Sequence, residues 1–137
     1  MNRVFKSYSE TRADLKGTLD QAESGLPVGI ERRNTRFMVV EVEDLLSVLT
    51  HSRSLPRPEA VPEGGGWSLM LPGVPVAADG ADLDEAVIEF SLALREYAED
   101  WVERLHAVPN HAPNRTLVQL VVLSDDEQLN DWIRGTG

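Results

Sequence analysis

The sequence predicts an α+β protein made of two modules. Alternating apolar and polar residues, typical of short strands, are interspersed with apolar residues at three- and four-residue spacing, typical of helices. A proline- and glycine-rich segment over residues 54–66 separates two halves, and the acidic residues are concentrated in the second half. We therefore expect an N-terminal β-α-β-β-α module over 1–53, a linker over 54–66, and an acidic module over 67–137. The acidic module should be an antiparallel sheet plus helix with an ordered C-terminal strand and helix.

Composition limits the class of protein. The 137 residues include no cysteine, which excludes disulfides and thiolate metal sites, and 42% of them are hydrophobic, which is enough for a buried core. No apolar run approaches the roughly 18 residues of a membrane span, and no signal-peptide core follows Met1. These features predict a cytoplasmic protein that does not enter the membrane.

The net charge is divided unevenly along the chain. Residues 1–54 contain eight Lys/Arg and eight Asp/Glu, whereas residues 55–137 contain five and fifteen, so the second half carries the whole net charge of −10. Clustered arginines in a neutral half suit nucleic acid, while an acidic half is repelled by phosphate and suits a basic partner. Solubility alone is the alternative explanation of the acidity.

The first module opens with a predicted strand over residues 3–6. A helix follows from Tyr8, because Ser7 and Glu10 have the spacing of a capping box, and Gly25 ends it. Apolar residues at helical spacing predict a narrow inward stripe, namely Tyr8, Leu15, Leu19 and Ala22.

A hairpin and a second helix complete the first module. Residues 28–30 and 37–40 are predicted strands, joined by a polar tip over 32–36 that holds three arginines. Residues 42–49 have acidic residues first and apolar residues behind, which predicts a short helix.

This order of elements and the residues that they carry resemble the Phd/YefM family of antitoxins. The resemblance covers about residues 1–50. Two departures stand out: Thr11 replaces the usual alanine, and the hairpin tip lacks the usual glycine, so we expect a different turn geometry there. The matching stretches are Ser-Tyr-Ser-Glu-Thr-Arg at 7–12 with Leu15, Pro-Val-Gly-Ile-Glu-Arg at 27–32, and Val39-Val40 leading into Val-Glu-Asp-Leu at 42–45.

The resemblance implies a function for each part. Members of the family dimerise through this module, bind operator DNA before their own operon, and neutralise a toxin with a more C-terminal segment. Their DNA-contacting arginines correspond to Arg12 and Arg32. From the chemistry of the tip we add Arg33, Asn34 and Arg36 as DNA-binding candidates. The alternative is that Arg12 pairs with an acid of its own helix, Asp14 or Asp20, and that the tip is merely solvated.

The acidic module contains the most strongly predicted helix. Strands are expected over 67–71 and 74–78, with a turn at Asp79-Gly80, and Asp82 with Glu85 caps the helix that follows. Its apolar positions recur at steps of four, three, four, three, four and four: Leu83, Val87, Phe90, Leu94, Tyr97, Trp101 and Leu105. The acidic residues on the other side are either solvated or the toxin-binding surface: Glu85, Glu89, Glu96, Glu99, Asp100 and Glu103.

Residues 63–101 also resemble the HicB-like antitoxin domain. The matching pieces are Gly66-Trp67, Leu71-Pro72-Gly73, Gly80 and Leu-Asp-Glu-Ala at 83–86. That family packs such a helix on a small antiparallel sheet and covers an RNase toxin with it. The strand that precedes this region in the family is not expected here, because prolines interrupt it.

The C-terminal segment offers no catalytic or metal site. His51, His106 and His111 have no metal-ligand or triad spacing, so we expect exposed loop histidines, no metal and no cofactor. Residues 116–123 form the most apolar run and predict a buried central strand. Ser124 with Glu127 should cap a final helix.

Together these features predict the antitoxin of a type II toxin–antitoxin system. The resemblance implies a homodimer that binds operator DNA and a cognate toxin. We expect the toxin to be basic, and an RNase is a candidate. Two other classes remain open: a dimeric adaptor or transcriptional regulator without a toxin, and a small enzyme that uses the acidic helix or the histidines.

Overall fold

The computed structural model describes residues 4–135 and confirms the α+β fold. Two three-stranded sheets and six α-helices are formed within these residues. The chain divides into two compact units, Met1–Leu45 and Leu46–Gly137, and the division falls within helix α3 (Val42–Leu49).

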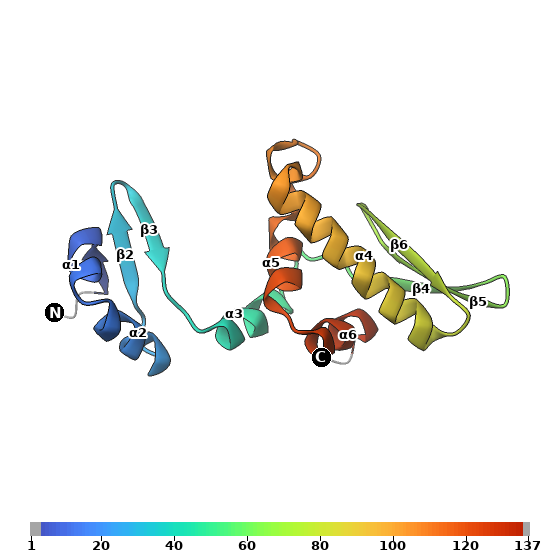
Figure 1. The fold of residues 1–137 in the computed structure, drawn as a ribbon, viewed down its shortest axis with the longest axis horizontal. Coiled ribbons are helices and arrows are strands. Elements are labelled where there is room, and N and C mark those ends of the chain that lie inside the picture. The colour runs from blue at the N-terminus through green and yellow to red at the C-terminus, as the bar shows by residue number, and fades with distance from the viewer. Residues whose placement is uncertain (1–3, 136–137) are drawn as a thin grey trace. The chain divides into compact units, whose positions relative to one another are not determined.

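The first unit is a small sheet with two short helices (Figure 1). Strand β2 (Gly29–Arg32) is central: it pairs in parallel with β1 (Phe5–Ser7) and antiparallel with β3 (Thr35–Met38). Helices α1 (Tyr8–Ala13) and α2 (Leu15–Glu23) follow β1 in the chain.

Asp14 divides the single helix that the sequence predicts into α1 and α2. Its φ of −139° is not helical, and its carboxylate accepts a hydrogen bond from the Gly17 amide at 3.1 Å, so it caps the second helix. The predicted cap of the first helix is present, since Ser7 Oγ accepts from the Glu10 amide at 3.1 Å.

The predicted inward stripe of this helix is largely wrong, because the break at Asp14 changes which side of each helix faces the sheet. Leu15 and Leu19 are 56% and 46% exposed, and Tyr8 is exposed as well. The buried residues of α1 and α2 are Thr11, Thr18 and Ala22. Each threonine hydroxyl donates to the carbonyl four residues earlier, Thr11 to Ser7 at 2.9 Å and Thr18 to Asp14 at 3.2 Å.

The second unit is an antiparallel sheet covered on one face by a long helix (Figure 1). The strand order is β4 (Glu59–Glu63), β5 (Gly66–Leu71), β6 (Val74–Gly80), and α4 (Leu83–Glu103) packs on the sheet. The core of the unit comes from alternate strand residues and from the predicted face of α4, and includes Leu69, Leu71, Val76, Val87, Phe90 and Leu94.

Prolines do not prevent a strand before Glu63, contrary to our expectation. β4 pairs with β5 from Glu59 to Glu63 although it contains Pro62, so part of the predicted linker 54–66 is a strand of the sheet. An edge strand pairs on one side alone and therefore tolerates a residue without an amide hydrogen. The opposite edge, β6, also contains a proline, Pro75, beside an irregularity in its register with β5.

The predicted central strand over 116–123 is instead a helix, α5 (Arg115–Leu123). Leu117, Val118, Leu120 and Val121 are buried while Val122 is exposed, which is the burial period of a helix rather than of a strand. Two short 3₁₀ turns, Leu105–Ala107 and Ala112–Asn114, lead from α4 to α5.

The final helix, α6 (Asp126–Arg134), begins one residue later than predicted. Its cap is Asp125, whose carboxylate accepts from the Gln128 amide at 2.7 Å, while the Gln128 side chain accepts from the Asp125 amide at 2.9 Å. Ser124, the predicted cap, donates its hydroxyl to the Leu120 carbonyl at 2.6 Å instead. Over residues 4–135, no helix combines the length and apolar character needed to cross a bilayer.

Candidate functional sites

Tyr8 contacts one of the arginines that the sequence predicts to bind DNA and shares a side of helix α1 with another. The Arg32 guanidinium carbon is 5.7 Å from the centre of the Tyr8 ring, within the range of a cation–π contact. Arg12 is exposed in the last turn of α1, four residues after Tyr8, and so shares its side of the helix. The fold therefore places Arg12 and Arg32, which are twenty positions apart in the sequence, on the side of α1 that carries the exposed Tyr8 ring.

The acids that the alternative assigned to Arg12 make other contacts. Asp14 caps α2 through the Gly17 amide, and Asp20 pairs with Lys16 at 2.7 Å. The charge of Arg12 is thus not matched by the neighbours proposed for it from the sequence.

Arg33 occupies a conformation that normally favours glycine. Arg32 pairs with Thr35, so Arg33 and Asn34 form a two-residue hairpin loop, and Arg33 has a φ of 57°. A side chain in this left-handed region costs about 1 kcal/mol relative to glycine. A positive φ is required at the first position of such a loop, and strained residues also cluster at functional sites, so the strain supports Arg33 as a candidate beside its charge.

Arg36 lies on the other face of the same hairpin. Its guanidinium carbon is 4.3 Å from the centre of the Phe5 ring. Residues that pair across two strands point to the same face of the sheet, so Arg32 and its partner Thr35 share a face. Arg36 is the next residue after Thr35 and therefore points to the opposite face from Arg32. The five DNA-binding candidates therefore form a group around Tyr8 (Arg12 and Arg32), a tip (Arg33 and Asn34), and a third position at Phe5 (Arg36).

The first unit leaves much of its apolar surface uncovered. Leu15 and Leu19 are exposed one turn apart on α2, and Phe37 and Met38 are exposed at the end of β3. A unit of this size buries a small share of its chain and commonly needs a partner to cover the rest. The two leucines were predicted to be core residues, and their exposure makes this surface a candidate interface.

Helix α4 exposes the acidic face that the sequence predicts. Two of the six acidic candidates have a local structural role. Glu85 caps the start of α4, accepting from the Ala81 amide at 3.2 Å, and Asp100 lies 3.8 Å from the Arg104 guanidinium. The other four carboxylates are exposed along the helix: Glu89, Glu96, Glu99 and Glu103.

One solved structure shares this fold across nearly the whole chain. It is described as the antitoxin part of a proposed toxin/antitoxin system from Syntrophomonas wolfei subsp. wolfei, with 17% sequence identity, a TM-score of 0.79, and coverage of 96% of each chain. No family model and no curated protein matches the sequence. The two-unit fold is therefore shared with that protein, whereas membership of the Phd/YefM family is not established.

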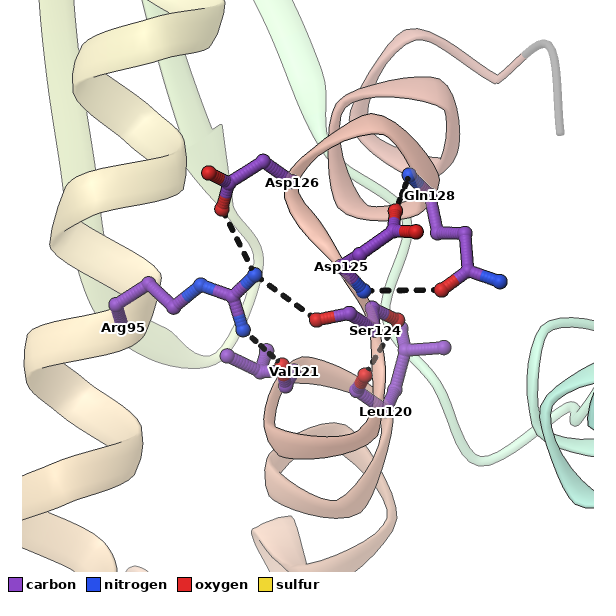
Figure 2. A network of polar contacts seen from close by, with 7 residues as sticks. All are labelled: Arg95, Leu120, Val121, Ser124, Asp125, Asp126 and Gln128. Carbon is purple, nitrogen blue, oxygen red and sulfur yellow. Dashed lines mark hydrogen bonds and ion pairs between the residues drawn. The ribbon is translucent and has the colours of Figure 1, made fainter. Parts of the chain in front are cut away.

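Arg95 has a role that the sequence does not reveal. By sequence it is one of the few cations on the acidic face. Its guanidinium donates to the carbonyls of Val121 and Ser124, the latter at 2.9 Å, and lies 3.1 Å from the Asp126 carboxylate (Figure 2). A cation at these carbonyls satisfies groups that the end of α5 leaves without helical partners. Arg95 thus joins α4 to the α5–α6 junction.

The histidines have local structural contacts. His111, predicted to be exposed, is partly buried: its Nδ1 is 2.8 Å from Tyr97 Oη, which also accepts from Asn114 Nδ2 at 2.8 Å. His51 and His106 are exposed, with Nδ1 near the carbonyls of Ser47 and Trp101. In the part of the chain that the structure describes, no cluster of three or more His, Asp or Glu side chains could hold a metal ion.

Proposed function

We propose that this protein is the antitoxin of a type II toxin–antitoxin system. The first unit binds operator DNA as a homodimer, and the second unit binds and covers a basic toxin. The observation that carries the proposal is the separation of charge between the two units. Exposed arginines cluster around Tyr8 and the β2–β3 hairpin, whereas exposed carboxylates cover the open side of α4. The fold shared with a protein described as an antitoxin supports the same assignment.

DNA binding rests on Arg12, Arg32, Arg33, Asn34 and Arg36. Guanidinium groups make bidentate contacts with phosphate, and those that reach base edges read sequence. The aromatic rings of Tyr8 and Phe5 limit the freedom of Arg32 and Arg36, which reduces the entropy lost on binding. In a dimer, two copies of this surface would meet a palindromic site about one helical turn apart.

DNA binding is tested with the Arg12→Ala/Arg32→Ala variant and a fragment from upstream of the gene. Affinity should fall at all sequences, and the slope of log K against log salt should decrease by about 0.9 for each phosphate that the variant no longer neutralises. Lys16→Ala is the matched control, because it removes an exposed positive charge that already pairs with Asp20. Equal affinity of the double variant and the wild type would contradict this assignment.

Dimerisation rests on the exposed apolar residues of the first unit. Covering Leu15 and Leu19 on α2 would bury apolar surface that the unit by itself leaves in water. Sedimentation of the wild type should give twice the chain mass, and Leu15→Gln/Leu19→Gln should shift the distribution toward monomer. Retained helical circular dichroism would separate loss of the interface from unfolding, and an unchanged dimer would show that the interface lies elsewhere.

Toxin neutralisation is tested with the protein encoded beside this gene. Its induction should arrest growth, and co-expression of this chain should restore growth and yield a complex in a pull-down. The antitoxin function would be refuted if co-expression neither restored growth nor yielded a complex. DNA binding without a complex would instead support the transcriptional regulator that the sequence also allows.

A further inference from the structure

A shallow apolar groove lies between α4 and α5. Its lining includes the buried Ala98 from α4 and Val121 from α5, and its volume is about 470 Å³. Val102 and Val122 are 60% and 57% exposed, one on each wall. Two valines that face each other across a groove gain free energy when a partner removes them from water.

The groove continues a stripe along the exposed side of α4. Ile88, Leu92, Arg95, Glu99 and Val102 follow one another at steps of four, three, four and three residues, so they lie along one side of the helix. Ile88 and Leu92 are also exposed. A second helix that lies along α4 could pack against this stripe, because an amphipathic helix presents its apolar residues at the same steps of three and four.

The rim of the groove is acidic. Glu99 and Glu103 line it, one helical turn apart, and neither carboxylate forms an ion pair with any group in residues 4–135. Like charges at this spacing repel each other, so a cation between them is favourable. The charge of the rim therefore complements a basic partner.

The one cation among the lining residues is engaged elsewhere. Arg95 donates to the Val121 and Ser124 carbonyls and pairs with Asp126, as Figure 2 shows. It therefore contributes little positive charge that could attract an anion or repel a basic partner. The same contacts hold α5 against α4, so both walls of the groove are fixed before a partner arrives.

We propose that this groove is the toxin-docking site and that its occupant is a basic amphipathic helix of the toxin. Apolar side chains of that helix would pack between Val102 and Val122, and its lysines or arginines would meet Glu99 and Glu103. A second copy of this chain fits less well, because residues 55–137 carry a net charge of −10 and would repel the carboxylates of the rim. This inference rests on the proposed antitoxin function.

The test measures binding of the full-length chain to the purified product of the adjacent gene. Val102→Gln/Val122→Gln removes the apolar walls without lowering helix propensity, and we expect it to weaken binding by about a hundredfold. Glu99→Gln/Glu103→Gln should weaken binding by about fivefold and reduce its salt dependence. The matched control is Val61→Gln/Met70→Gln on the sheet strands, where the two side chains are 46% and 44% exposed.

The outcomes separate this inference from the proposed function. If the wild type forms no complex, the proposed function fails and the docking site fails with it. If the wild type binds and the Val102/Val122 variant binds equally well, or the control variant alone is impaired, the groove is not the docking site and the antitoxin function stands. Self-association of the wild type that the Val102/Val122 variant abolishes would identify a second copy as the occupant and overturn the proposal.

Discussion

The Arg95 guanidinium donates to the Ser124 carbonyl at 2.9 Å, across 29 positions of sequence. Two further contacts, with the Val121 carbonyl and the Asp126 carboxylate, make Arg95 the polar link between α4 and the junction of α5 and α6 (Figure 2). The side chain is 29% exposed, so these hydrogen bonds are partly shielded from water.

Arg95→Met should destabilise the second unit by about 2 kcal/mol, because it leaves carbonyls of the α5 terminus without their charged donor. Urea unfolding monitored by circular dichroism measures the change. Arg95→Lys should recover little of the loss, since an ammonium lacks the planar fork that reaches both carbonyls. The control is Arg104→Ala, which removes an exposed pair at 3.8 Å and should cost less than about 0.5 kcal/mol.

Arg33→Gly should stabilise the first unit by about 1 kcal/mol while it weakens DNA binding. The substitution relieves a φ of 57° at the hairpin loop and also removes a candidate phosphate contact. For stability alone, Asn34→Gly is the matched control, because Asn34 has no positive φ to relieve and glycine there raises the entropy of the unfolded chain. Thermal unfolding of both variants and DNA titration of Arg33→Gly give the two quantities. Normal DNA affinity of a stabilised Arg33→Gly variant would contradict a role of Arg33 in DNA binding.

Asp125→Ala should cost about 1 kcal/mol, since it removes one half of a reciprocal cap at the start of α6. Glu127→Ala, at the position that the sequence pattern favours, should change the free energy of unfolding by less than about 0.5 kcal/mol. Comparable losses in the two variants would show that general acidity at the helix start matters more than the cap itself.

Gly80→Ala should destabilise the second unit by more than about 2 kcal/mol. A Cβ at this position would lie 2.3 Å from the backbone nitrogen of Ala86, in the first turn of α4. The sequence predicts Gly80 in a turn, but it ends strand β6, and its small size lets the helix backbone approach the sheet. Ala77→Gly, at an exposed position of the same strand, controls for the general cost of altering β6.

Tyr97→Phe should loosen the loop between α4 and α5, because it removes the hydroxyl that joins His111 and Asn114. We expect a destabilisation of about 1 kcal/mol and faster amide hydrogen exchange in residues 105–114, with little change along α4. Uniformly faster exchange would indicate a role in the core instead of in the loop.

A helix whose apolar residues recur at helical spacing over many residues could be predicted from the sequence. A short segment whose residues suit a helix and a strand equally well could not. The middle of the predicted apolar face of α4 is buried as expected, at Val87, Phe90, Leu94 and Tyr97, because residues at helical spacing pack together against the sheet. Leu83 and Trp101 are partly exposed, and Leu105 lies beyond the end of the helix. The sequence predicts a strand over 116–123, but a short run of Leu and Val fits a strand or a helix equally well by its spacing alone. Packing against α4 and the hydrogen bond from Arg95 to the Val121 carbonyl favour the helix. Both involve residues outside the segment 116–123 itself.

The candidate sites show the same division. The acidic side of α4 follows from its periodicity, and the clustered arginines follow from composition. Arg32 and Arg36 lie on opposite faces of the hairpin because of the strand register, which places Arg36 one residue beyond the Arg32–Thr35 pair. The exposure of Leu15 and Leu19 depends on the break at Asp14, a residue that competes with the helical backbone for hydrogen bonds.

The prolines in the two outer strands of the second sheet have a consequence for recognition. A partner that extends a sheet by adding its own strand depends on a row of free main-chain donors and acceptors. β4 and β6 each lack one donor, at Pro62 and Pro75, so neither border offers an uninterrupted template. Binding by this unit therefore favours side-chain chemistry over main-chain pairing, and single substitutions on its helices are well suited to change which partner it accepts.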